Sequence, residues 1–227
     1  MEYGQFCPIA KASEIIGEKW TVLIIRELLM GSRRFSDLQR GLGSISPTLL
    51  TRRLVDLEMR GMILKRRISG QKSFEYIPTE QCRTLLPILL ALGDWGMQWA
   101  RSNLTSKDYD VELLITYLQR SIQPHKLPAA ETIIRFKFTD VKDKAAWWLV
   151  VQSGATDICD KDPGKDVDIF FTTTVKTMVD IWMGETTYRK ALAKDEIKII
   201  GPTLLVNNVT NWMQNSLFSE LPSAREI

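Results

Sequence analysis

Apolar residues recur at helical spacing from the start of the chain and predict a series of helices. Segments 8–16 and 19–30 each carry an apolar stripe that would face a core. A shorter helix is expected over 35–42, with Ser36 as its N-cap and Asp37 in its first turn, where a carboxylate suits the positive helix end. The N-terminal part is therefore expected to be a small helical bundle.

The next helix, expected over 46–60, has two chemically different faces. Ser46 supplies the cap and Pro47 takes the first helical position, where its missing N–H costs nothing. One face carries Leu50, Leu54 and Leu57. The other carries Thr48, Thr51, Arg52 and Val55. We expect the leucines to face the core and the threonines and arginine to face outward.

A hairpin and a further helix are expected after this helix. Residues 62–68 and 74–78 have the composition of strands, and 69–73 that of a turn. Pro78 removes a ladder donor, so the return strand is expected to end early or to lie at an edge. With a helix over 79–101, these elements are those of a winged helix-turn-helix domain.

Small polar residues at 102–108 predict a linker to a second domain. Residues 132–139 alternate apolar and basic side chains, which is typical of a half-buried strand. The other expected elements are helices over 109–122, 175–184, 186–194 and 209–218, and strands over 145–153, 166–174 and 196–201. The predicted fold class is α+β, with a winged helix-turn-helix DNA-binding and dimerisation domain at 1–102 and an α+β domain at 103–227.

The composition is that of an ordinary globular protein. Hydrophobic residues make up 44% and charged residues 25% of the 227 positions. No apolar run is long enough for a membrane helix, and the start has no signal-peptide pattern. Three widely separated cysteines fit a reducing compartment. We therefore expect a cytoplasmic protein without membrane contact.

Positive charge is concentrated in the first half. Residues 1–103 hold 15 Lys+Arg against 10 Asp+Glu, net +5, whereas 104–227 hold 15 against 17, net −2. Within 19–72 the counts are 12 against 4, net +8. Such a local excess is the electrostatic footprint of a protein that binds a polyanion, although a solvated basic face would look the same.

The helix over 46–60 and the hairpin supply the candidate contacts to double-stranded DNA. An α-helix fits the major groove, where arginine pairs with guanine and threonine reaches the thymine methyl. The candidates on this helix are Ser46, Pro47, Thr48, Thr51, Arg52 and Arg53. The candidate phosphate contacts are Arg33, Arg34, Lys65, Arg66, Arg67 and Lys72. The alternative for any single arginine is an ordinary surface charge.

Several motifs in fixed order resemble the HxlR family of bacterial winged-helix regulators. They are CPIAKASEIIGEKW, LIIRELLMGSRRFSDLQRGLGSISPTLLTRRLVDLEMRGMILKR, FEYIPTE and LLPILLALGDW, and they span about residues 6–100. The resemblance implies a transcription regulator that acts as a homodimer held by helices at 8–16 and 80–101, with 46–60 as the reader. Pro78 and Cys82 depart from the family pattern, and the departure at Pro78 concerns the wing.

The resemblance also draws attention to Cys7, which stands at the family's N-terminal cysteine position. Some relatives resemble redox sensors that use this thiol, and Cys7 precedes a helix with Lys11 one turn on. The alternative is a small residue at a dimer interface. Both interpretations stay open at this point.

Catalytic and metal-binding patterns are poorly supported. The single histidine, His125, has no thiol or second histidine near it in sequence. The acidic stretch 157–168 lacks a glutamate at the twelfth position of a calcium loop and is expected to be a solvated loop. We therefore expect no metal, no cofactor and no enzymatic activity.

The element order over about 130–221 resembles the sterol carrier protein family, which implies a cavity for an apolar ligand. The candidate lining residues are Phe136, Phe138, Trp147, Trp148, Phe170, Met178, Trp182, Trp212 and Met213. The alternative is that these side chains simply fill the core. The predicted function is a cytoplasmic homodimeric regulator whose second domain senses a ligand or supports assembly. The alternative is a hydrophobic-ligand carrier whose first domain serves mainly dimerisation.

Overall fold

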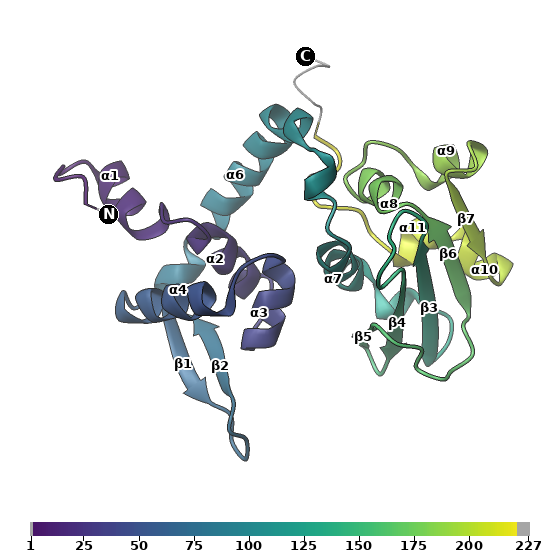
Figure 1. The fold of residues 1–227 in the computed structure, drawn as a ribbon, viewed down its shortest axis with the longest axis horizontal. Coiled ribbons are helices and arrows are strands. Elements are labelled where there is room, and N and C mark those ends of the chain that lie inside the picture. The colour runs from purple at the N-terminus through teal and green to yellow at the C-terminus, as the bar shows by residue number, and fades with distance from the viewer. Residues whose placement is uncertain (1, 222–227) are drawn as a thin grey trace. The chain divides into compact units, whose positions relative to one another are not determined.

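The structure is a computed structural model that describes residues 2–221 (Figure 1). It divides into two compact units, Met1–Gly96 and Met97–Ile227. Each unit is built around a hydrophobic cluster of its own. The two units are therefore described one at a time.

The first unit contains five helices, most of a sixth that runs past Gly96, and a two-stranded hairpin among its described residues. In chain order they are α1 (Pro8–Ile16), α2 (Thr21–Leu29), α3 (Phe35–Leu42), α4 (Pro47–Met59), β1 (Ile63–Arg67), β2 (Phe74–Pro78), α5 (Glu80–Arg83) and α6 (Leu86–Trp99). The single helix expected over 79–101 is interrupted between α5 and α6. Arg34, not Ser36, is the N-cap of α3, and its backbone N–H donates to Asp37 Oδ2 at 3.4 Å.

The core of the first unit lies between α2, α3 and α4. Leu50, Leu54 and Leu57 of α4 are buried in the same cluster as Ile24, Ile25, Leu28 and Leu38. Burying a side chain of this size contributes about 1.5–3 kcal/mol. This packing fixes the inward side of α4, as the sequence pattern predicts.

A buried carboxylate connects α2 to α3. Glu27 is fully buried and accepts hydrogen bonds from the Arg26 guanidinium at 2.9 Å and from Ser32 Oγ at 3.2 Å. The same guanidinium donates to the Gly41 carbonyl at 3.0 Å. A Cβ atom at Gly41 would overlap the Glu27 carboxylate, so only glycine lets the two helices approach this closely.

The hairpin keeps its full length despite its proline. Its strands pair antiparallel from Ile63 opposite Pro78 to Arg67 opposite Phe74. Because Pro78 is the last residue of β2, its missing N–H does not interrupt the ladder, and the expected early end of the strand is not observed. The segment before α3 joins β2 from its other side, with the Tyr76 N–H donating to the Arg33 carbonyl at 2.8 Å.

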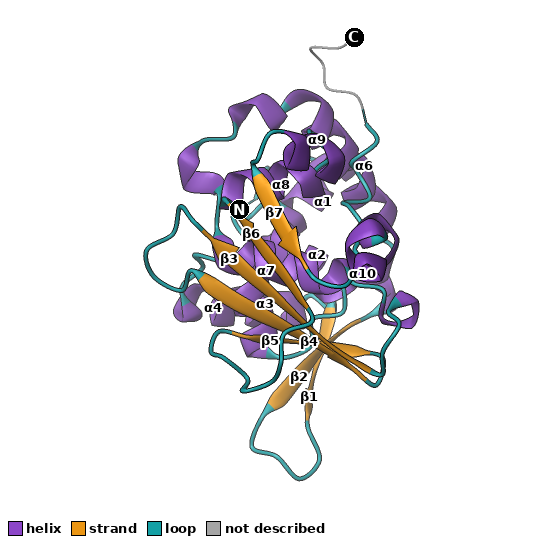
Figure 2. Ribbon diagram, turned by 90° about the vertical axis from the view of Figure 1, so that its right-hand side faces the viewer, coloured by secondary structure: helices purple, strands orange, loops and turns teal. Residues whose placement is uncertain are grey.

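The second unit is a five-stranded sheet with helices (Figure 2). Its helices are α7 (Val111–Ser121), α8 (Val175–Trp182), α9 (Tyr188–Ala193), α10 (Thr203–Asn207) and α11 (Val209–Trp212). Its strands are β3 (Glu131–Phe138), β4 (Ala146–Gln152), β5 (Ala155–Cys159), β6 (Ile169–Thr173) and β7 (Ile197–Ile200). Short 3-10 helices occupy Arg101–Asn103, Ser106–Asp108 and Pro124–Lys126.

The strand order in this sheet is β5-β4-β3-β6-β7, with β3 and β6 parallel and the other pairs antiparallel. Two expectations are corrected here. The acidic stretch expected to be a loop begins inside β5. The last helix, expected over 209–218, ends at Trp212.

One face of the sheet packs into the core of the second unit. Six of the nine candidate lining residues are buried there together: Phe136, Phe138, Trp147, Met178, Trp212 and Met213. Phe136 stacks on Phe171 with ring centroids 4.8 Å apart. Phe170 and Trp182 are only half-buried. The ninth candidate, Trp148, does not belong to this core.

The contact between Gly41 and Glu27 predicts a large cost for one added methyl group. We expect Gly41→Ala to lower the free energy of unfolding by about 2 kcal/mol or more, because the carboxylate loses its place beside α3. Urea unfolding followed by circular dichroism measures this loss. Gly96→Ala is the matched control, since no atom lies within 4 Å of its added Cβ atom. Equal effects of the two substitutions would contradict the prediction.

The buried hydroxyl of Tyr188 predicts alkaline destabilisation of the second unit. Burial raises the pKa of Tyr188 above its ordinary value, so the folded state keeps the neutral form. The stabilisation is complete below pH about 10, where unfolded tyrosine is neutral, and is lost above it as the unfolded state ionises. Relative to Tyr188→Phe, the free energy of unfolding should fall by about 1.4 kcal/mol per pH unit above that point. Parallel pH profiles of the two proteins in urea titrations would disprove it.

Candidate nucleic-acid interface

The outward face of α4 carries the side chains expected to read DNA. Ser46 caps the helix, and its Oγ accepts a hydrogen bond from the Leu49 N–H at 3.3 Å. Pro47 takes the first helical position, as predicted. Thr48, Thr51 and Arg52 are all exposed. The helix thus presents polar groups on the side opposite its leucines.

Two of these exposed side chains, Thr51 and Arg52, differ in whether they form hydrogen bonds within the protein. The Thr51 hydroxyl donates to the Pro47 carbonyl at 2.9 Å, which occupies its proton. The Arg52 side chain makes no hydrogen bond or ion pair within residues 2–221. Its guanidinium is therefore available for a bidentate contact to a guanine edge.

Arg53 lies on the opposite side of α4 and is removed from the set of candidate contacts. It is only 8% exposed, and its guanidinium donates to the Lys19 carbonyl at 3.0 Å and to Glu18 at 2.7 Å. A further hydrogen bond of 3.3 Å reaches Asp56. Because its charge is paired inside the domain, Arg53 positions α4 against the start of α2. The sequence contained the signal, since Arg53 is three residues after Leu50.

The two arginines before α3 lie at the junction of α2, α3 and the hairpin. The Arg33 guanidinium donates to the Leu28 carbonyl at 2.9 Å, which satisfies a carbonyl at the end of α2. Arg34 is exposed, and its backbone forms an isolated antiparallel β-bridge with the backbone of Glu75 in β2. Arg34 is therefore the freer of the two to meet a phosphate.

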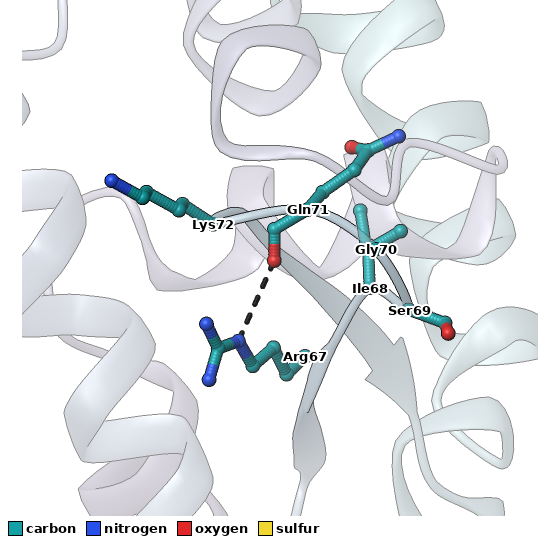
Figure 3. A pocket seen from close by; sticks show the side chains of 6 residues that line it. All are labelled: Arg67, Ile68, Ser69, Gly70, Gln71 and Lys72. Carbon is teal, nitrogen blue, oxygen red and sulfur yellow. Dashed lines mark hydrogen bonds between the residues drawn. The ribbon is translucent and has the colours of Figure 1, made fainter.

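The hairpin carries four basic side chains, all exposed. Arg66 pairs with Glu75 at 2.7 Å, and the Lys65 ammonium lies 4.6 Å from the centroid of the Phe74 ring. At the tip, residues 67–72 line a shallow hollow (Figure 3). There Arg67 Nε donates to the Gln71 carbonyl at 3.4 Å, while the Lys72 side chain extends away from the turn. The basic groups thus follow the hairpin to its tip.

Two helices of the first unit expose apolar side chains. The α1 region exposes Tyr3, Phe6 and Ile9. Helix α6 exposes Leu86, Ile88, Leu90, Leu92, Trp95 and Trp99. Apolar surface of this extent normally marks an interaction site. The sequence resemblance assigns the same two segments to the dimer.

The cysteines differ in their surroundings. Cys82 is fully buried, and burial raises the pKa of its thiol, which favours the unreactive protonated form. Cys7 is half-buried at the start of α1 and makes no side-chain capping bond. Its role stays a prediction. Over residues 2–221, no group of three or more histidine, cysteine or acidic side chains is arranged to hold a metal ion.

No helix in the described part of the chain combines the length and apolar character needed to cross a membrane.

Comparison with known proteins identifies the first half. Residues 15–104 match the HxlR-like helix-turn-helix family. The chain is 34% identical over 102 residues to the HTH-type transcriptional regulator YvaP of Bacillus subtilis (strain 168), covering 44% of this chain and 94% of YvaP. It is 35% identical over 100 residues to the HTH-type transcriptional regulator sll1512 of Synechocystis sp., covering 43% of this chain and 73% of sll1512. The solved structure of the redox regulator HypR in its reduced form is 32% identical, with a TM-score of 0.38, and the match covers 43% of this chain and 93% of the HypR chain.

The second half matches a different family from the one expected. Residues 101–218 match the alkyl sulfatase C-terminal family, which replaces the sterol carrier protein resemblance inferred from the sequence. The expected α+β class with an N-terminal winged helix-turn-helix domain is confirmed. The chain therefore belongs to the HxlR-like helix-turn-helix family of transcription regulators and carries a domain of the alkyl sulfatase C-terminal family behind the DNA-binding one.

Proposed function

We propose that this chain is a sequence-specific DNA-binding regulator that acts as a homodimer, with α4 in the major groove. The observation that carries the proposal is the pair of opposite faces on α4. Its leucines are buried, while Thr48, Thr51 and an unpaired Arg52 are exposed. Short hydroxyl side chains and a guanidinium on one face of a helix suit the base edges of that groove.

The hairpin and the segment before α3 are proposed to hold the DNA backbone. Arg34, Lys65, Arg66 and Lys72 are exposed cations. Contacts of this kind fix the register of the protein on the duplex without reading its sequence. Arg33 and Arg67 already donate to backbone carbonyls, so we propose that they contribute less to phosphate binding than the other four cations.

The homodimer is proposed to form through α1 and α6. The start of α1 with the residues before it, and α6, expose large apolar side chains, and association would remove these from water. A two-fold dimer would place its two reader helices on half-sites about 34 Å apart, or a multiple of that distance. The corresponding operator is a rough palindrome.

The second domain, taken as residues 103–227, is proposed to sense an effector or to support assembly. Effector binding and DNA binding must then be coupled reciprocally. The carrier alternative has weaker support, because most of the side chains proposed to line its cavity pack against one another. We also propose that the protein stays in the cytoplasm and that its activity is regulatory, not enzymatic.

Removing the Arg52 guanidinium tests the assignment of the reader helix. We expect Arg52→Ala to weaken binding at least about 30-fold in a gel shift with DNA from upstream of the protein's own gene, because each dimer loses two bidentate base contacts of about 1–3 kcal/mol each. Arg189→Ala, an exposed arginine of α9, is the matched control and should bind normally. Unchanged binding by Arg52→Ala would refute the assignment.

Salt dependence tests the phosphate contacts separately. With roughly six to eight phosphates neutralised per dimer, the slope of log affinity against log salt should be about −5 to −7. Lys72→Gln should reduce its magnitude by about 2, since each dimer loses two contacts. Lys194→Gln, which changes an exposed lysine after α9, should leave the slope unchanged. A wild-type slope near zero would exclude this mode of binding.

A further inference from the structure

The outer face of the five-stranded sheet, opposite the core, carries a charged side chain between aromatic rings. Because side chains alternate along a strand, Ile134, Phe136 and Phe138 enter the core and Arg135 points to the other face. In Figure 2 the strands of this sheet lie in front of α7 and α8. We call this side the outer sheet face.

Arg135 is held between two rings on this face. Its guanidinium carbon lies 5.4 Å from the Trp148 ring centroid and 5.9 Å from that of Phe170. Both neighbours follow from strand register, since Arg135 is opposite Trp148 in β4 and opposite Phe170 in β6. The rings restrict the guanidinium, so little side-chain entropy would be lost when it binds a partner.

The polar groups at this position have unused hydrogen-bonding capacity. Arg135 Nε and Trp148 Nε1 are both buried, and neither has a hydrogen-bond partner. Trp148 as a whole is only 7% exposed. Arg135 forms no ion pair within residues 2–221. Buried donors without partners are rare in native proteins, and a ligand or an ordered water can supply the missing acceptor.

The charges around Arg135 on the outer sheet face favour an anion. Lys137 follows on β3, and strand pairing places Thr172 and then Lys198 beside it. Of the acidic groups near this face, Glu131 is paired with Lys165, and the Asp168 carboxylate accepts a hydrogen bond from the Ile133 N–H at 2.7 Å. Asp157 of β5 lies opposite Val150, two strands away from β3, and Val150 is opposite Ile133, two residues before Arg135. The local balance is therefore positive, although residues 104–227 carry a net charge of −2.

Apolar surface lies next to the arginine. Phe170 is half-buried, and its partner across the β6–β7 pair, Ile200, is 52% exposed. A ligand that matches these features has an oxyanion for the guanidinium and a flat apolar body for Phe170 and Ile200. A carboxylate suits the planar guanidinium because two parallel hydrogen bonds can form.

We propose that the outer sheet face of the second domain binds a small aromatic carboxylate, with Arg135 as its anchor. As the effector site of a regulator, this proposal rests on the proposed function; as a binding site, it stands alone. The site lies on the side of the sheet away from the aromatic core. Trp148 and Phe170, two of the residues expected to line an internal cavity, thus contribute to the outer sheet face instead.

Calorimetric titration of the full-length protein with 2-naphthoate tests the binding class. We expect saturable binding to one site per chain. Binding of 2-naphthol, which has the ring without the charge, and of acetate, which has the charge without the ring, should each be at least tenfold weaker. No binding of 2-naphthoate, or equal binding of 2-naphthol, would overturn the proposal.

Substitutions at the anchor test the location. Arg135→Gln should weaken 2-naphthoate binding at least tenfold, and Arg135→Lys, which keeps the charge without the planar fork, should weaken it less. Lys126→Gln, which removes an exposed lysine on a 3-10 helix, is the matched control and should bind as the wild type does. The melting temperature of each variant shows whether it is folded. If Arg135→Gln does not fold, the loss of affinity in Arg135→Lys tests the location. Wild-type affinity in both Arg135 variants would overturn the location.

The gel shift separates this proposal from the proposed function. Arg135→Gln should bind DNA as the wild type does when no ligand is present. Lost naphthoate binding with retained DNA binding supports the site. If the wild type fails to bind DNA, the regulator assignment fails, while the calorimetric result still decides whether the outer sheet face binds a carboxylate.

Discussion

The packing of Leu50, Leu54 and Leu57 against α2 and α3 decides which side of α4 faces outward. Rotating the helix would bury Arg52 or expose three leucines, and both changes cost free energy. An ion pair reinforces this orientation, because Arg53 joins α4 to Glu18 and also donates to the Lys19 carbonyl. The buried Glu27 lies against Gly41 where α2 packs on α3, which holds together the two helices that the leucines pack against. The threonines and the arginine on the outer side therefore face solvent in the folded domain, and no rotation of α4 is needed to expose them.

Much of the first unit could be predicted from the sequence, because its signals are local. The apolar period places α2 and α4, the Ser46-Pro47 pair fixes the start of α4, and the strand composition locates the hairpin. The expected Ser36 cap of α3 is wrong because the chain before the helix pairs with β2, a contact distant in sequence. The spacing from Leu50 places Arg53 toward the buried face, but its partners are 34 and 35 residues away, so no local pattern shows that its charge is paired.

The second unit was less predictable because its distinctive features arise from strand pairing. The alternation of side chains predicts β3, whereas β5 lies in a polar stretch that forms a strand at the edge of the sheet and has no such pattern. The final helix is shorter than expected, since the apolar periodicity continues past Trp212 and the helix does not. No local pattern shows that Arg135 lies between Trp148 and Phe170, because these residues come from three strands. That arrangement became visible only with the register.

The central claim is that the outer side of α4 meets the bases. Threonine-methyl NMR of the full-length protein during titration with operator DNA tests it directly, with the Thr48 and Thr51 signals assigned by Thr→Ser substitution. The account predicts that the largest shifts occur at these two methyl groups. It also predicts that Thr116 and Thr132, buried in the second unit, stay unchanged. Specific DNA binding that leaves the Thr48 and Thr51 methyl signals unmoved would contradict the account.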